Sequence, residues 1–383
     1  MNNKFKNSLL NGLGTIAMIV IALIIGGVLI TISGNGVGDA YGAIIRGAFG
    51  SVSKITELFV KLCPILLMAF GISIAFKAQL WNIGAQGQFV IAGVASVAVA
   101  LYIPVPFAIR IPLSLIAALV AGGFWGWIAA WLKNTFNAPE VISTLMLTYI
   151  ANYFNLWMIN GPMHDPYSDL PQSDIIPEAM YLPKLIGTYR LNAGIFIMLL
   201  VVVIMFFFWK SSLGYRVDLI GQGSKVAAYA GINMKKTVYT TLFISGAICG
   251  LAGWIEMFGI QYRLLDGLAA DYSNIATIIA LLGNLKVVGI IVSACFFSIL
   301  LCGGSSMQRM TDVPYSIVGV IEGLIIIFII AKNVVSERMI AASVKKAVKS
   351  IEKARPDIQS DSGPSDSVSD VTYDNGKGGQ DND

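Results

Sequence analysis

Long, continuously apolar runs alternate with short polar segments over most of the chain. A run of about 20 apolar residues can cross the hydrocarbon core of a bilayer as an α-helix. A transmembrane β-barrel would instead need segments of about 10 residues that alternate in polarity. The pattern therefore predicts an all-α, polytopic transmembrane helical bundle of about ten spans, placed at 12–33, 58–76, 78–101, 111–132, 137–159, 193–209, 238–259, 273–285, 287–302 and 314–331.

Polar and glycine residues interrupt this pattern twice. The third span starts with AQLWNIGAQGQ before it becomes apolar, and the short eighth and ninth spans meet at GNLK. Irregular backbone at membrane depth is tolerated only where protein or a water-filled cavity satisfies its polar groups. Paired interrupted helices also mark the central site of many transporters. We therefore expect broken helices beside a pathway, with Asn82, Gln86, Gln88 and Asn284 as candidate pathway residues.

A polar loop, residues 210–237, joins the sixth and seventh spans. It sets five basic residues against a single aspartate, an excess that places a loop on the cytoplasmic side of the membrane. Its middle, 224–232, is too short to form a core and is rich in small residues. Small residues would let a short helix approach the backbone of another protein closely. The alternative is an ordinary basic cytoplasmic loop.

The chain divides into a transmembrane domain, 1–331, and two C-terminal segments. Residues 332–355 have apolar side chains at helical spacing among lysines, which predicts a basic amphipathic helix on the membrane surface. Residues 356–383 are rich in Asp, Ser and Gly, which predicts a disordered acidic tail. Because each predicted inner loop carries Lys or Arg, we expect a multi-pass cell-membrane protein with both termini in the cytoplasm.

Composition supports the membrane assignment. Of the 383 residues, 56% are hydrophobic and 13% charged, whereas soluble domains are about 45–50% apolar. The net charge of +4 is set by loops and tail, so it bears on orientation and lipid headgroups and not on nucleic acid. The apolar run 12–33 is longer than the core of a signal peptide, so we expect an uncleaved first span.

Catalytic chemistry is missing from the sequence. A single histidine, His164, excludes a paired-histidine metal site, and the four cysteines lie in apolar segments without a C-x-x-C pair. The run 221–225 lacks the Gly-Lys-Ser/Thr order of a phosphate-binding loop. We therefore expect free thiols, no catalytic residue, no metal, no cofactor and no ATP hydrolysis by this chain.

A proton-coupled carrier is the alternative from another functional class. Such a carrier would need acidic groups near the membrane midplane, where ionisable side chains are costly. Glu140 and Glu256 are expected near the ends of their spans, and Lys61 is expected as an anchor at the membrane interface. Glu322 is then the remaining candidate for proton coupling.

Three stretches together resemble one family. WNIGAQGQFVIAG (81–93) resembles the NIGxEGQ signature of permease subunits of ABC importers, in the branch related to ribose and branched-chain amino acid permeases. NAPEVISTLMLTYIANY (137–153) is similar to the NEVISTLMLNYIA segment of the nucleoside subgroup. The loop from LGYRVDLIGQGSKVAAYAGINMKKT into the following Gly-rich span (213–253) is similar to the cytoplasmic coupling region of that family. The resemblance covers nearly the whole chain up to about residue 331.

The sequence departs from the family pattern near the expected pathway. Gln86 stands where the family usually has Glu, and Ala138-Pro139 interrupts the expected Asn-Glu. The stretch 268–289 keeps the ALLG core but lacks the usual Gly-Phe before it and the usual Pro near Val287. These differences bear on the identity of the substrate.

The resemblance implies the membrane subunit of an importer, embedded in membrane lipids. Its partners would be a cytoplasmic ABC ATPase, a second permease subunit in a heterodimer and an extracellular substrate-binding lipoprotein. The implied cargo is nucleosides, with sugars or branched-chain amino acids as the alternative. The implied ATPase-coupling residues are Ser224, Ala227, Ala228 and Gly231.

Neutral amides at the first helix break could serve either of two purposes. Asn82, Gln86 and Gln88 could hydrogen-bond a nucleobase or ribose along the pathway, with each bond contributing about 1 kcal/mol net. They could equally only satisfy the polar groups of the broken helix, and the sequence leaves both interpretations open.

Overall fold

The computed structural model describes residues 2–268, 270–311, 313–325 and 327–328. The regular elements of these ranges are helices, which confirms the all-α prediction. The predicted surface helix at 332–355 and the predicted tail at 356–383 lie outside the described residues. In chain order the elements are α1 (Asn2–Ile32), α2 (Val37–Phe49), α3 (Val52–Lys77), α4 (Ala85–Tyr102), α5 (Phe107–Phe136), α6 (Glu140–Asn160), η1 (Glu178–Met180), α7 (Gly194–Phe208), α8 (Ser212–Gln222), α9 (Ser224–Tyr229), α10 (Met234–Glu256), the π-helical η2 (Met257–Gln261), α11 (Ala270–Leu282) and α12 (Val287–Thr311).

The polytopic bundle is confirmed, and its spans differ in length. Among the described residues, α3, α4, α5, α10 continued by η2, and α12 are long and apolar enough to cross a membrane. The bent pairs α1–α2 and α7–α8 raise the number from five to seven if each pair forms one span. The remaining predicted spans coincide with α6 and with two short apolar helices, Tyr272–Leu282 and Ser316–Ile325. The last two helices are too short to cross a membrane alone, which is one reason why ten apolar runs give fewer full crossings.

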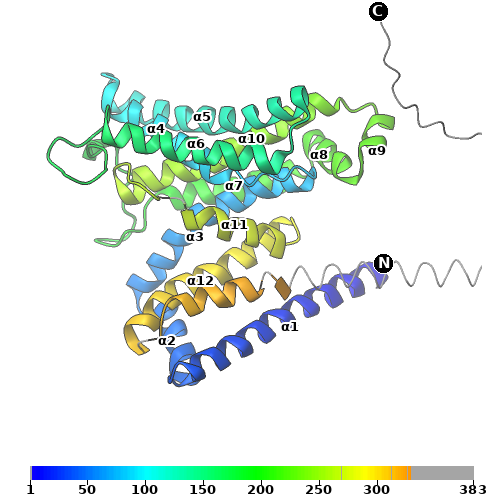
Figure 1. Ribbon diagram of the computed structural model, residues 1–383, viewed down its shortest axis with the longest axis vertical. Coiled ribbons are helices and arrows are strands. Elements are labelled where there is room, and N and C mark those ends of the chain that lie inside the picture. Colours follow the sequence, from blue (N-terminus) through cyan, green and yellow to red (C-terminus); the bar gives the residue numbers. More distant parts are fainter. Residues whose placement is uncertain (1, 269, 312, 326, 329–383) are drawn as a thin grey trace, which may run out of the picture. The chain divides into compact units, whose positions relative to one another are not determined.

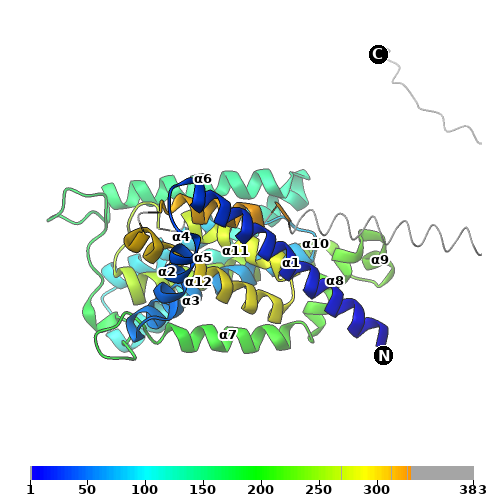
Figure 2. The same ribbon diagram turned by 90° about the horizontal axis from the view of Figure 1, so that it is seen from below.

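Helix α3 lies at the centre of the bundle (Figures 1 and 2). Its sequence is apolar on all sides, which is typical of a helix surrounded by protein. Accordingly, 89% of its most apolar window is buried, and it packs against α10, α11, α12, α7 and α8. A displacement of α3 would therefore change the packing of most helices in the bundle.

Glycine residues bring α10 into close contact with its neighbours. A Cβ atom on Gly122 of α5 would lie 2.5 Å from the carbonyl oxygen of Gly246 in α10. A Cβ on Gly253 would lie 2.5 Å from the carbonyl oxygen of Phe89 in α4. Helices in membranes associate largely through such close packing of small residues. These glycines therefore allow α10 to pack closely against both α5 and α4.

The two ends of the bundle carry different structures (Figures 1 and 2). Helices α8 and α9 lie at one end, where α1 also begins, and the loop 161–192 lies at the opposite end. Backbone hydrogen bonds tie this loop to the end of α10: Ser173 N–H donates to Leu264 at 3.0 Å, Ile176 N–H to Tyr262 at 2.9 Å and Leu182 N–H to Phe258 at 2.9 Å. The loop is therefore an ordered cap over η2 and not a loose connection.

Candidate functional site: the coupling helix and two helix breaks

The loop 210–237 folds into α8 and α9, which project beyond the ends of the spanning helices (Figures 1 and 2). Ser211 caps α8, because its Oγ accepts a hydrogen bond from the Gly214 N–H at 3.2 Å. Gly223 (φ 137°) separates the two helices, and Gly231 (φ 70°) follows the end of α9. Both backbone conformations are ones that glycine adopts without strain. The glycines of the loop thus define a short helix of six residues, with Ser224 as its first residue.

Helix α9 has a buried side and an exposed side. Ala227 is fully buried, in an apolar cluster that also contains Ile220 and Val238. Ala228 is exposed, as is Gly231 just beyond the helix. Tyr229, whose role the sequence did not suggest, is 93% exposed. In the isolated chain Ala227 therefore anchors α9 to the bundle, while Ala228, Tyr229 and Gly231 form the outward surface.

Helix α8 connects α9 to the central helix. Lys77 at the end of α3 forms an ion pair with Asp218 of α8, with 3.2 Å between Nζ and Oδ1. Gln222 donates to the other oxygen of Asp218 at 2.9 Å. Gly221 lies so close to the carbonyl oxygen of Lys77 that a Cβ there would clash with it. A displacement of α9 would therefore be transmitted to α3 through α8, which contacts the end of α3 closely at Lys77.

The first helix break is organised by Asn82, which is fully buried. Its Nδ2 donates to Ser245 of α10 at 3.0 Å and to the Oε1 of Gln88 at 3.2 Å. Its Oδ1 accepts from the Gln88 amide at 3.2 Å and from the Gly84 N–H at 3.1 Å. All the hydrogen-bonding groups of Asn82 are thus engaged within the chain. This network favours the interpretation that Asn82 and Gln88 satisfy the broken helix.

The start of α4 packs against α6, so two of the family-like stretches meet. A Cβ on Gly84 would lie 2.9 Å from the Cβ of Thr144 in α6, and a Cβ on Gly87 would lie 2.9 Å from the Cα of Thr148. The Thr144 hydroxyl also accepts from the Ile83 N–H at 3.3 Å. Gly84 and Gly87, in the stretch 81–93, therefore pack directly against Thr144 and Thr148, in the stretch 137–153. Gln86, between them, remains half-buried.

The second helix break is a tight turn between α11 and α12. Asn284 (φ 51°) and Leu285 (φ 56°) both adopt left-handed backbone conformations. Gly283 and Gly289 approach each other too closely for a Cβ on either residue. Asn284 is exposed at this turn, whereas Asn82 and Gln88 are buried against α10. The structure therefore brings Asn82 together with Gln88 and places Asn284 at a separate site.

Replacing Asn82 tests whether this network is structural. Asn82→Leu removes the partner of Gln88, Ser245 and the Gly84 N–H, and buried groups left unpaired cost about 1–3 kcal/mol each. We expect a loss of stability of about 2–3 kcal/mol, measured by thermal unfolding of the purified chain in detergent. The matched control is Gln86→Leu, which changes a half-buried amide only four residues further along the chain. Equal stability of the two variants would contradict the structural role of Asn82.

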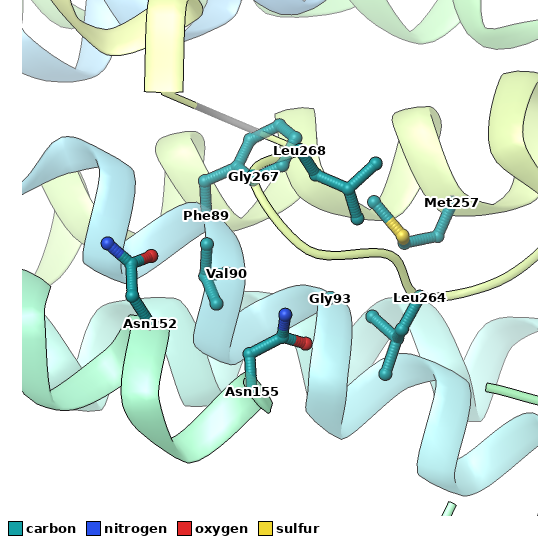
Figure 3. A pocket seen from close by; sticks show the side chains of 9 residues that line it. All are labelled: Phe89, Val90, Gly93, Asn152, Asn155, Met257, Leu264, Gly267 and Leu268. Atoms are coloured by element: carbon teal, nitrogen blue, oxygen red, sulfur yellow. The ribbon is translucent and has the colours of Figure 1, made fainter. Parts of the chain in front are cut away.

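A small cavity lies between α4, α6 and the loop that follows η2 (Figure 3). It measures about 10 Å³, roughly the space that one water molecule needs. Asn155 on α6 borders it, 4% exposed, with Nδ2 donating to the Leu265 carbonyl at 3.0 Å. Its Oδ1 is buried without a hydrogen-bond partner among the described residues. Asn155 is therefore a polar position in a mostly apolar lining that the sequence did not single out.

A buried polar cluster lies at the end of α10 that is tied to the loop 161–192. Glu256 is the last residue of α10, at the end of its span as the sequence predicts, and it is fully buried, with its Oε1 accepting from Gln261 at 2.9 Å. Lys61 is half-buried and donates to the Tyr272 hydroxyl at 3.1 Å. The π-helical η2 follows Glu256 directly, and its residues 257–260 are also buried.

Residues 54–330 match the family described as the permease component of the branched-chain amino acid transport system. The chain is 32% identical over 327 residues to the glucose ABC transporter permease protein TsgB13 of Haloferax volcanii, covering 82% of this chain and 86% of the relative. No solved structure matches the chain.

Two bacterial relatives match over nearly their whole length. The guanosine ABC transporter permease protein NupP of Bacillus subtilis is 31% identical over 332 residues, covering 86% of this chain and 95% of the relative. The nucleoside ABC transporter permease protein NupB of Lactococcus lactis subsp. cremoris is 30% identical over 364 residues, covering 92% and 99%.

Proposed function

Because this chain belongs to the family of permease components of branched-chain amino acid transport systems, we propose that it forms the translocation pathway of an importer for nucleosides. It is a transmembrane permease subunit of an ABC importer, and subunits of this kind work with an ATPase and a substrate-binding protein. Nucleosides are favoured because the guanosine and nucleoside permeases cover the chain most fully among the three relatives described above. Sugar transport is the second candidate, since the glucose permease is equally similar in sequence.

The outward surface of α9 is the observation that carries the coupling role. Ala228 and Gly231 offer little steric hindrance to an approaching protein, and Tyr229 supplies a large exposed ring beside them. Aromatic side chains are enriched at the energetic centres of protein interfaces. We assign this surface to the ATPase, on the side of the membrane that the basic residues of the loop place in the cytoplasm. Both termini would then be cytoplasmic.

Transport by this subunit requires a change of conformation and no covalent chemistry. The ATP-bound and ATP-free forms of an ATPase can shift a permease only by binding its conformations with different affinity. The contact of α8 with the end of α3 gives such a difference a route into the centre of the bundle. We propose that ATP is hydrolysed wholly on the partner, that a second, non-identical permease completes the pathway, and that an extracellular lipoprotein delivers the substrate.

Reconstitution tests the proposed function and its cargo together. The chain is purified with its ATPase, its second permease and its binding lipoprotein, and uptake of radiolabelled guanosine, glucose and leucine into liposomes is measured with and without ATP. We expect ATP-dependent uptake of guanosine alone. Glucose or leucine uptake would reassign the cargo, and guanosine uptake by this chain alone under a proton gradient would show a secondary carrier.

Gln86 is the pathway candidate that the first helix break leaves available. Since it is half-buried while Asn82 and Gln88 are paired with each other, its amide is the one best able to reach a substrate. For Gln86→Ala we expect the KM for uptake to rise roughly fivefold, the effect of about 1 kcal/mol from one lost hydrogen bond. The thermal stability should not change. An unchanged KM would remove Gln86 from the pathway.

A further inference from the structure

A large cavity opens where α3, α7, α8 and the turn between α11 and α12 come together. Its volume is about 780 Å³, far more than the small cavity beside Asn155. Its lining includes the end of α3, the end of α7, the start of α8 and residues 285–289. Each of these segments lies where an apolar helix ends or begins, so the cavity lies at the level expected for lipid headgroups.

The charge of the lining is predominantly positive. Lys77, Lys210 and Lys286 border the cavity, against a single acidic residue, Asp218. Lys77 is paired with Asp218, at 3.2 Å. Lys210 and Lys286 are exposed and form no ion pair within the part of the chain that the structure describes. Two positive charges are therefore available for an anion that enters the cavity.

Apolar and aromatic surface adjoins these charges. Trp209 and Tyr215 line the cavity, with the Lys77 ammonium 5.9 Å from the centre of the Trp209 ring. Phe206 and Val288, also in the lining, are 42% and 60% exposed. Tryptophan and tyrosine are enriched at the level where headgroups meet acyl chains. A ligand that matches the whole cavity would carry a negative charge and an apolar body.

We propose that this cavity binds an anionic phospholipid, with the phosphate between Lys210 and Lys286 and the acyl chains along Phe206 and Val288. Basic pockets between membrane helices on the cytoplasmic side are suited to such headgroups. The bound lipid would contact both α8, which connects to α9, and the turn between α11 and α12. It would thereby stabilise one arrangement of these two elements, whatever the imported substrate is.

Native mass spectrometry of the full-length chain tests the lipid site. The purified protein is titrated with phosphatidylglycerol and, separately, with phosphatidylcholine of the same acyl chains. We expect retention of phosphatidylglycerol, and the double variant Lys210→Ala/Lys286→Ala should bind it roughly 30-fold more weakly, since each lysine near an anionic surface contributes about 1 kcal/mol. Both lysines are exposed, so the fold should not suffer. The matched control is Lys235→Ala/Lys236→Ala, two lysines of the same basic loop outside the cavity, which should leave binding unchanged.

Four results would overturn the proposal. Equal retention of phosphatidylcholine, or an unchanged affinity in the Lys210/Lys286 double variant, would show that the charges do not select the lipid. Binding of inorganic phosphate as tightly as phosphatidylglycerol would make a soluble phosphate the ligand. Much tighter lipid binding by a chain that lacks 356–383 would assign the cavity to that acidic segment.

Discussion

Ala228→Trp is expected to abolish ATP-dependent uptake while leaving membrane insertion intact. Ala228 is exposed on the outward surface of α9, so the larger side chain can extend away from the buried side of the helix. It would be forced into a close interface with the ATPase, and overpacking of a fitted contact costs about 1–3 kcal/mol. The affinity for the ATPase should therefore fall roughly 10- to 100-fold. Co-purification with the ATPase and uptake by reconstituted liposomes measure the two effects.

A second variant perturbs the same surface by another route, and a control separates the interface effect from a general effect of a new bulky side chain. Gly231→Val should act in the same direction, because a β-branched residue is strained at the positive φ of this position. Ala179→Trp is the matched control, since Ala179 is also exposed and lies in η1, in the loop at the other end of the bundle. It should leave ATPase binding unchanged. Normal uptake by Ala228→Trp would refute the coupling role of α9.

Gly122→Leu is expected to prevent stable folding of the bundle. The first carbon of the new side chain would already lie 2.5 Å from the Gly246 carbonyl oxygen and 2.9 Å from the Gly250 Cα. Both are backbone atoms, so α5 and α10 must move apart instead of one side chain moving aside. We expect a destabilisation of at least about 3 kcal/mol, at the upper end of overpacking costs. Size-exclusion chromatography and thermal unfolding in detergent would show it.

Gly319→Leu provides the control for a glycine inside a helix. Among the described residues, a Cβ there would meet nothing within 4 Å, so the intrinsic change from glycine to leucine should dominate. That change favours a helix by up to about 1 kcal/mol. The control variant should therefore be as stable as the unmodified protein or slightly more stable. Equal behaviour of Gly122→Leu and Gly319→Leu would mean that α5 and α10 can separate at little cost.

The sequence was sufficient for those features that depend on local composition. Apolar run length identified the apolar helices, and the polar, glycine-bearing stretches at 81–88 and 283–288 marked the connections between α3 and α4 and between α11 and α12. The small residues of the loop 210–237 identified the short helix α9. In each case the physical signal lies within a few residues, so no knowledge of packing is needed.

Features that depend on distant residues could not be predicted. Asn82 is satisfied by Ser245, 163 positions further along the chain, so its pairing could not be read from its neighbours. Ala227 and Ala228 are adjacent and chemically identical, yet only the packing against α8 and α10 decides that the first is buried. Glu256 does lie at the end of α10, but no local pattern announces its complete burial or the π-helical turn that follows it. Nor did any motif mark the lysines around the large cavity as a group.

The ordered cap over η2 has a mechanical consequence for the assembled transporter. Helix α10 is held at one end by the hydrogen bonds of the loop 161–192, and at the other it follows directly from α9 through the Asn233 cap. Its glycine contacts with α5 leave little room for bending between these ends. A protein bound to the loop 161–192 and an ATPase bound to α9 would thus act on opposite ends of α10, a helix with little room to bend. Signals for arrival of substrate and for binding of ATP could then be exchanged without any rearrangement of the intervening residues.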